Sequence, residues 1–132
     1  MQQNNQKFIS NHEDLEAYQI AFDAALKIFD ISKNFPKEEK YALTDQIRRS
    51  SRSVCANLAE ASRRRRYKAS FLSKLNDAEA EAAARQVWLK FAVKCQYLDV
   101  ETGRQLYSQY NQILGLIVTM INSADKWLLK NN

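Results

Sequence analysis

Apolar residues recur every three or four positions along four stretches of this chain, and this spacing predicts four long helices. The first begins near residues 11–14 and ends at Asn34-Phe35-Pro36, because a residue before proline avoids the helical region. The second starts at residues 37–39 and extends to Arg65. The third covers residues 67–96, and the fourth extends from Asp99, a candidate N-cap, to Leu129.

Each stretch carries one stripe that we expect to face a core. The first stripe is Leu15, Tyr18, Phe22, Ala25, Phe29 and Ser32. The second is Leu43, Ile47, Ser50, Val54, Leu58 and Ala61. The third is Phe71, Leu75, Ala78, Ala82, Leu89 and Ala92. The fourth is Tyr110, Ile113, Leu114, Ile117, Met120, Ile121, Ala124 and Leu128.

Short connections between long helices imply antiparallel neighbours, so the predicted fold is all-α, an up-down-up-down antiparallel four-helix bundle. Residues 12–130 form this single domain, and residues 1–11, rich in Gln and Asn, are expected to be a flexible lead-in. The second half of the third helix is apolar nearly all round, which predicts a central helix or a second burial against another subunit. Gly115 is a candidate for a close helix crossing.

The residue types present argue against catalysis. His12 is the only histidine, so no Glu-x-x-His pair for a di-iron bundle exists, and no glycine-rich phosphate loop is visible. Cys55 and Cys95 stand far apart without a CxxC motif and are expected to be reduced, packed thiols. We therefore expect no enzyme, metal, cofactor or small-molecule substrate.

The chain shows neither a secretion signal nor an apolar run of the roughly 20 residues that span a bilayer. These features predict a cytoplasmic protein without a membrane partner. Its formal net charge of +5 favours a polyanionic partner such as RNA, DNA or an acidic protein.

Basic residues gather on the second helix and just beyond it. Guanidinium groups suit phosphate because they offer paired donors. The candidate nucleic-acid contacts are Arg48, Arg52, Arg63, Arg64, Arg65, Arg66 and Lys68. The alternative is a solvated face whose arginines form salt bridges between subunits.

Two adjacent segments carry a family resemblance. Residues 41–49 read Tyr-Ala-Leu-Thr-Asp-Gln-Ile-Arg-Arg, and residues 53–60 read Ser-Val-Cys-Ala-Asn-Leu-Ala-Glu. This pattern resembles the intervening-sequence proteins of 23S ribosomal RNA, which are related to accessory proteins of diversity-generating retroelements. The resemblance implies a four-helix bundle that assembles as a ring-like homopentamer, and it implies no catalysis. Its retroelement branch implies a reverse transcriptase and its template RNA as partners.

This chain departs from the family pattern where Cys55 replaces a proline and Ala61 replaces a glycine, and both changes favour an unbroken second helix. Several polar or aromatic residues of the pattern are interpreted as structural or interface positions instead of ligand contacts. They are Gln46, Arg49, Asn57, Glu60, Glu81 and Trp88. Glu60 can pair with Arg64 one turn on, or across helices with Arg48 or Arg49 of a neighbour.

Two hypotheses follow from the sequence. The first is a non-enzymatic homo-oligomeric bundle that binds RNA or a ribonucleoprotein through the basic face of the second helix. The second is a protein-interaction scaffold, or a reverse-transcriptase accessory subunit, that does not contact nucleic acid directly.

Overall fold

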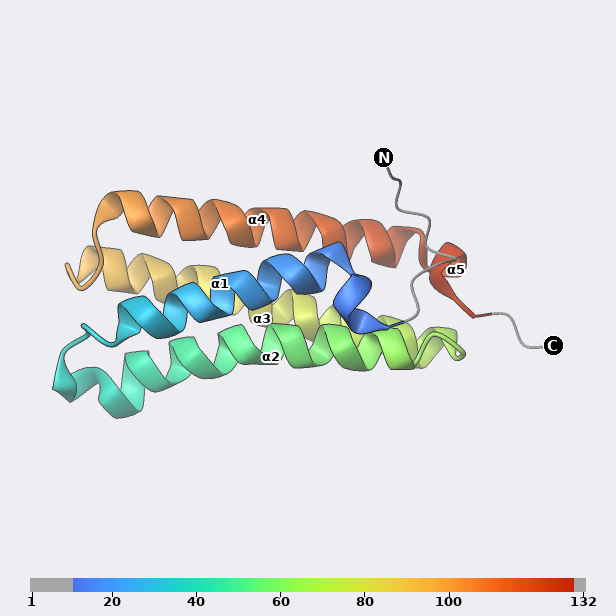
Figure 1. Ribbon diagram of the computed structural model, residues 1–132, viewed down its shortest axis with the longest axis horizontal. Helices are drawn as coiled ribbons and strands as arrows, with labels where there is room; N and C mark the ends of the chain where they lie inside the picture. Colours follow the sequence, from blue (N-terminus) through green and yellow to red (C-terminus); the bar gives the residue numbers. More distant parts are fainter. Residues whose placement is uncertain (1–10, 130–132) are drawn as a thin grey trace.

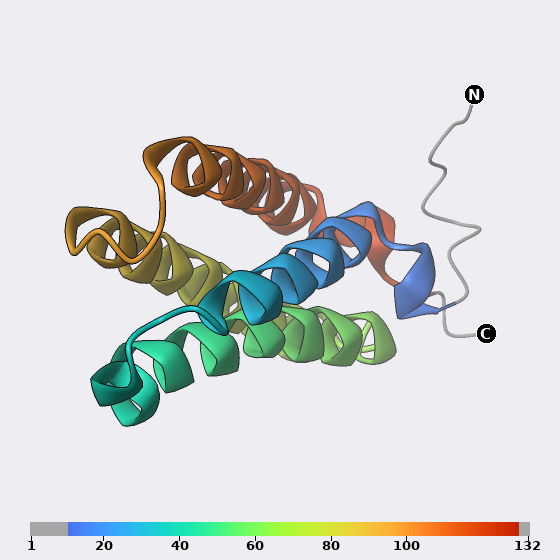
Figure 2. The same cartoon turned by 60° about the vertical axis from the view of Figure 1, so that its left-hand side comes forward.

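The computed structural model describes residues 11–129, and all the regular structure in that range is helical. Four long helices, α1 (Glu16–Ser32), α2 (Asp45–Arg63), α3 (Lys68–Lys94) and α4 (Val100–Asn122), run up and down in chain order (Figure 1). Each packs against two others, α1 and α3 both lying between α2 and α4. Figure 2 shows the four arranged around a common interior. The predicted all-helical bundle is confirmed.

Short elements close the two ends of the bundle. A 3-10 turn, η2 (His12–Asp14), precedes α1, and Asn11 caps it by accepting a 2.8 Å hydrogen bond from the Glu13 amide. A second 3-10 turn, η3 (Lys37–Glu39), and a π-helical turn, η4 (Lys40–Thr44), lead into α2. The predicted second helix is therefore α-helical only from Asp45. The expected flexible lead-in falls almost wholly outside the described residues.

The connection between α3 and α4 is fixed by local backbone chemistry. Gln96 adopts a positive φ of 64°, and the Tyr97 amide donates to the Ala92 carbonyl at 2.9 Å while the Gln96 amide donates to Val93. These two hydrogen bonds form a Schellman motif, which satisfies the last carbonyls of α3. Asp99 then caps α4, accepting a 2.9 Å hydrogen bond from the Thr102 amide. The predicted cap is confirmed.

The core stripes predicted for α2 and α3 are all buried, and five of the eight residues predicted for α4 and α5 (Ala124–Trp127) are buried as well. The stripe predicted for α1 is only partly correct: Leu15 and Ser32 are buried, and Tyr18 and Ala25 are half-buried. Its interior face is formed by Ala17, Ala21, Ala24 and Ile28, whereas Phe22 and Phe29 are exposed. Alanine leaves room for α2 and α4 to approach closely, and aromatic rings at these positions would hold the helices apart.

The glycine prediction is also wrong. A side chain at Gly115 would meet open space, so no close crossing requires it. The close approach is instead at Gly103, where a Cβ atom would overlap the Val93 side chain of α3. Gly103 thus lets the start of α4 pack directly on the end of α3.

Candidate nucleic-acid interface

The N-terminal half of α2 carries two arginines on the side that faces α1. The Arg48 Nε atom donates a 2.7 Å hydrogen bond to the Ser32 hydroxyl, and its guanidinium lies 4.8 Å from the centre of the Phe29 ring. Arg52 is exposed, with its guanidinium 5.7 Å from the same ring. The Lys33 ammonium lies 4.9 Å from it. One phenylalanine therefore gathers three cations at the C-terminal end of α1.

Cation–π contacts at exposed sites contribute about 0.5–1 kcal/mol each. That energy is enough to restrict the rotamers of Arg48 and Arg52 while their remaining donors stay available. Helical spacing predicts that these arginines share an outward face, and the structure adds the Phe29 ring that orients them. We call Lys33, Arg48 and Arg52 the Phe29 cluster.

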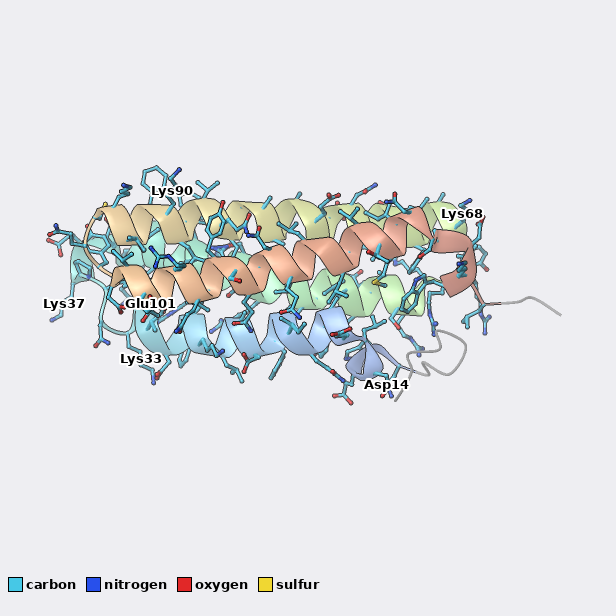
Figure 3. All side chains as sticks on the ribbon, turned by 90° about the horizontal axis from the view of Figure 1, so that it is seen from above. Asp14, Lys33, Lys37, Lys68, Lys90 and Glu101 are labelled. Atoms are coloured by element: carbon cyan, nitrogen blue, oxygen red, sulfur yellow. The ribbon has the colours of Figure 1, made fainter. Side chains whose placement is uncertain are left out.

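A second basic group lies where α2 ends and the chain turns into α3. Arg63 and Arg66 are exposed. Arg64 forms a 3.5 Å ion pair with Glu60 and donates a 3.1 Å hydrogen bond to the Ser70 hydroxyl. Lys68 pairs with Asp125 of α5 at 2.9 Å. Figure 3 shows Lys33 and Lys68 toward opposite ends of the bundle, so the basic residues form two groups.

Arg65 does not belong to this surface, which corrects its predicted nucleic-acid contact. Its side chain is only 4% exposed. The Arg65 Nε atom donates to the Ser62 carbonyl at 3.1 Å, and its own carbonyl accepts a 2.9 Å hydrogen bond from the Leu129 amide. Position 65 follows Leu58 and Ala61 at the spacing of the buried stripe, so its inward direction agrees with the periodicity of α2 although the helix itself ends at Arg63.

A groove of about 560 Å³ runs between α1 and α2 and lies between the two basic groups. Its walls combine the outward aromatic face of α1 with small residues of α2. They are Tyr18, Phe22, Ala25, Leu26, Phe29, Arg52, Cys55, Ala56 and Ala59. Several residues expected to fill the core on α1 therefore line an open surface feature.

The structural assignments made from the family pattern have mixed outcomes. Glu60 pairs with Arg64 as predicted, and it also bonds across helices to Lys74 of α3 at 3.6 Å. Its pairing with Arg48 or Arg49 of a neighbour stays a prediction. Arg49 is exposed and pairs with Asp45 of its own helix at 3.2 Å. Gln46 and Trp88 line a small cavity between α2 and α3. The structural role of Asn57, which is half-buried, stays a prediction.

Arg85, the largest fully buried side chain, is absent from the residues predicted from the sequence. Its three guanidinium nitrogens have no hydrogen-bond partner within the described chain. Burial lowers the pKa of Arg85 to about 10, while Tyr110 and Glu81 oppose this by favouring the charged form. The helical spacing of α3 could have predicted this burial, because position 85 continues the buried stripe from Ala82 to Leu89. The role of Glu81 as a buried partner for an arginine stays a prediction, because the Arg85 nitrogens have no hydrogen-bond partner within residues 11–129.

The Tyr110 hydroxyl and the Cys55 thiol are buried in the same interior. Burial raises the pKa of Tyr110 well above its ordinary value, and Cys55 contributes in the same direction. Burial raises the pKa of the Cys55 thiol to about 11. Cys95, by contrast, is exposed, so the expectation that both thiols are packed holds only for Cys55.

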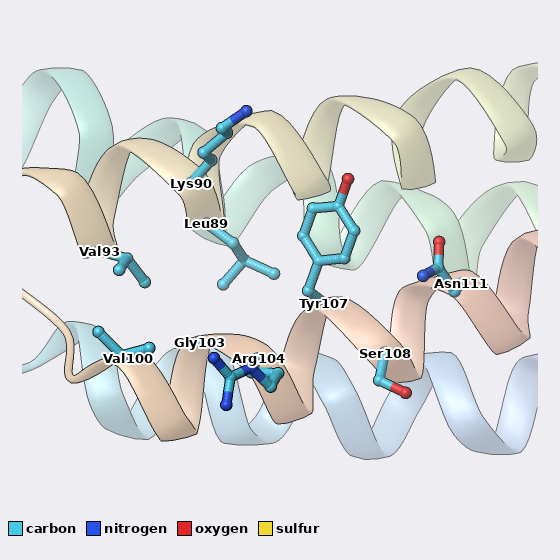
Figure 4. Close-up of a pocket in the computed structure, with 9 residues that line it drawn as sticks. All are labelled: Leu89, Lys90, Val93, Val100, Gly103, Arg104, Tyr107, Ser108 and Asn111. Atoms are coloured by element: carbon cyan, nitrogen blue, oxygen red, sulfur yellow. The ribbon is translucent and has the colours of Figure 1, made fainter.

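A second groove, of about 510 Å³, lies between α3 and α4 on another side of the bundle. Figure 4 shows Lys90 and Tyr107 at this groove, with Leu89 and Val93 on α3 facing α4. Val87 and Phe91 of α3 are exposed as well, and Phe91 lines the small cavity between α2 and α3. The apolar second half of α3 is therefore a partly open surface and not a helix enclosed by its own bundle.

The described residues contain neither a cluster of metal ligands nor a membrane-spanning helix. Between residues 11 and 129, no cluster of three or more His, Cys, Asp or Glu side chains is placed to hold a metal ion. Over the same span, no helix combines the length and apolar character required to cross a membrane.

Comparison with known proteins decides the family. A sequence model of the family described as "23S rRNA-intervening sequence protein" matches residues 13–119, which include all four long helices up to near the end of α4. The chain belongs to this family. The predicted family relationship is therefore confirmed, and the match includes α2 with its Arg48 and Arg52.

A solved relative has the same fold. It is a protein of unknown function from the S23 ribosomal protein family of Bacteroides thetaiotaomicron VPI-5482, 27% identical in sequence with a TM-score of 0.73. The similarity covers 80% of this chain and 95% of that one. None of the curated proteins matches this chain. The family match and the solved relative thus support the bundle fold. The biochemical role is inferred from the surface residues.

Proposed function

We propose that this protein is a non-enzymatic helical bundle that binds RNA, alone or within a ribonucleoprotein, through the α1–α2 face. The observation that carries the proposal is the pair of basic groups at the two ends of α2. The Phe29 cluster lies at one end, and Arg63, Arg64 and Arg66 lie at the other. Buried Arg65 is outside the proposed surface, and Lys68 contributes less because Asp125 neutralises it.

Phosphate contacts explain this arrangement better than base-edge recognition does. Guanidinium groups bind phosphate oxygens with paired donors, and such contacts weaken as salt rises because counterions are released on binding. The family description refers to ribosomal RNA, which agrees with a polyanionic partner. The net charge of +5 adds favourable long-range attraction.

The test compares wild type with the double variant Arg63→Ser, Arg66→Ser by fluorescence anisotropy on labelled RNA across a salt series. We expect weaker binding, and a slope of log affinity against log salt that is smaller by about 0.7–0.9 for each phosphate that the variant no longer binds. The matched control is Lys90→Ser, Arg104→Ser, which removes two exposed cations from the α3–α4 face. Equal affinities for wild type and the Arg63, Arg66 variant would refute the proposed site.

The exposed apolar surface of α3 supports a second candidate function. Val87 and Phe91 are 51% and 53% exposed, which suits contact with another copy of this chain or with a protein such as a reverse transcriptase. A ring-like homopentamer, as the family resemblance implies, would use such a surface in head-to-tail contacts. Sedimentation of purified wild type that shows an oligomer while RNA binding is absent would favour the scaffold function.

A further inference from the structure

The outward face of α1 presents aromatic rings that its own bundle covers only in part. Tyr18 is half-buried, and its ring meets the His12 ring in a T-shaped contact at 4.8 Å between centroids. Phe22 is 47% exposed, and its ring stacks on Tyr18 at 5.9 Å between centroids with a 27° angle between planes. Both rings line the α1–α2 groove. Large apolar side chains at regular helical spacing are normally buried, so an open row of them indicates a surface that meets a partner.

The opposite wall of the groove is shallow and apolar. Cys55, Ala56 and Ala59 of α2 form it, and their short side chains leave space beside the rings of α1. None of the nine residues that line the groove is acidic. The groove can therefore accept a flat apolar group without bringing a negatively charged partner against a carboxylate.

The basic groups lie at the right places to hold a chain that crosses this groove. Arg52 and Arg63 are 11 residues apart on α2, which corresponds to about 16 Å along the helix. That distance spans a few nucleotides of an extended strand. Phe29 already has cations around its ring, whereas no cation is placed over the Phe22 or Tyr18 ring in the described structure.

We propose that the α1–α2 groove binds the bases of single-stranded RNA by stacking on Phe22 and Tyr18, while the flanking arginines hold the phosphates. This inference rests on the function proposed above and adds the class of nucleic acid and the second kind of contact. Stacking on aromatic rings accepts any base, so it provides affinity with little sequence preference. A duplex cannot bind in this way because its bases are stacked on one another.

A second copy of the chain is the competing occupant of the groove. Charge argues against it, because each copy carries a net charge of +5 and the groove is bordered by arginines. A single strand of RNA satisfies both features at once, with apolar base faces in the groove and phosphates at the positive ends.

The experiment uses the full chain with Phe22→Leu, and Tyr41→Leu in η4 as the matched control, because Tyr41 lies outside the grooves and the proposed contact surfaces. Leucine keeps apolar contact and removes the aromatic face, and both residues are exposed, so neither change should unfold the bundle. The labelled probes are single-stranded RNA of about 12 nucleotides, an abasic strand of equal length, and the corresponding duplex. Circular dichroism and sedimentation accompany the binding measurements.

Wild type is expected to bind the single strand more tightly than the abasic strand or the duplex. Phe22→Leu should weaken single-strand binding about tenfold and leave abasic binding unchanged, and Tyr41→Leu should change neither. Equal binding of single and abasic strands by wild type would overturn this inference while leaving phosphate binding by the arginines intact. A change of oligomeric state in Phe22→Leu would also overturn it and assign the groove to subunit contact. Absence of binding to every probe would overturn both proposals.

Discussion

Replacing Arg85 with methionine should stabilise this protein, because the bundle buries a guanidinium group that methionine would replace with an uncharged chain. Arg85 is 0% exposed, and its three side-chain nitrogens have no hydrogen-bond partner within residues 11–129. The Tyr110 ring, 5.8 Å from the guanidinium carbon, gives it a favourable contact. Methionine is flexible and apolar, so it can fill much of the same space without charge.

The burial of Arg85 gives the expected change in the free energy of unfolding. Burial lowers the pKa of Arg85 from 12.5 to about 10, and one pKa unit corresponds to about 1.4 kcal/mol, so holding the charge inside costs about 3 kcal/mol. The substitution also removes the cation–π contact with Tyr110, which contributes about 1–2 kcal/mol when desolvated. The net expectation is a gain of about 1–2 kcal/mol in the free energy of unfolding.

The measurement is urea denaturation followed by circular dichroism at pH 7 and one fixed protein concentration. Arg85→Lys is the matched control, because it keeps a buried cation and should give no gain. Neutral pH is preferable to an alkaline titration, because above pH 10 the contributions of Arg85 and Tyr110 to stability change in opposite directions. The lowered pKa of Arg85 makes its contribution to stability rise between pH 10 and 12.5, while the raised pKa of Tyr110 makes its own contribution fall as pH increases above 10.

Reduced stability of Arg85→Met would refute this reasoning. Breaking a buried ion pair typically costs about 3–5 kcal/mol. A decrease of that size would show that Arg85 meets an anionic partner in solution, for example through a different rotamer of Glu81.

The remaining predictions concern glycine packing and alkaline stability. Gly115→Ala should raise the free energy of unfolding by about 0.5–1 kcal/mol, because alanine favours helix and its Cβ meets open space. Gly103→Ala should lower it by about 1–3 kcal/mol through overlap with Val93, and equal effects of the two changes in urea denaturation would contradict this. Burial raises the pKa of Cys55 from 9.0 to about 11, so its contribution to stability is present below pH 9 and declines as pH rises toward 11. Cys55→Ala should reduce the alkaline decline, measured by thermal unfolding at pH 8 and 10.5.

The candidate site is only partly predictable from the sequence. Arg48 and Arg52 share a side of α2, and helical periodicity alone establishes that. Position 65 follows Leu58 and Ala61 at the spacing of the buried stripe, so the charge of its side chain, and not the helical spacing, led to its wrong assignment to the surface. The Phe29 cluster requires α1 and α2 to lie side by side in a particular register, which no local pattern specifies.

Arg85 and the α1 face show a second limit. The spacing places position 85 in the buried stripe of α3, but charged residues are rarely buried, so residue type argues against the spacing there. On α1, two neighbouring stripes are both apolar, and the aromatic one is the more hydrophobic. The alanine stripe is nevertheless the buried one, because alanine side chains permit the close approach of α2 and α4 to α1.

The sequence by itself determined the four helices, most of their boundaries, the α2 and α3 core stripes and the family, because periodicity and capping act over a few residues. Tertiary structure alone decided which face of α1 is buried and that Arg65 and Arg85 are buried despite their charge. Those outcomes depend on how closely the helices approach and on whether packing outweighs the cost of burying a charge. They place an open aromatic groove between two basic groups, and the proposed binding of single-stranded RNA rests on that juxtaposition.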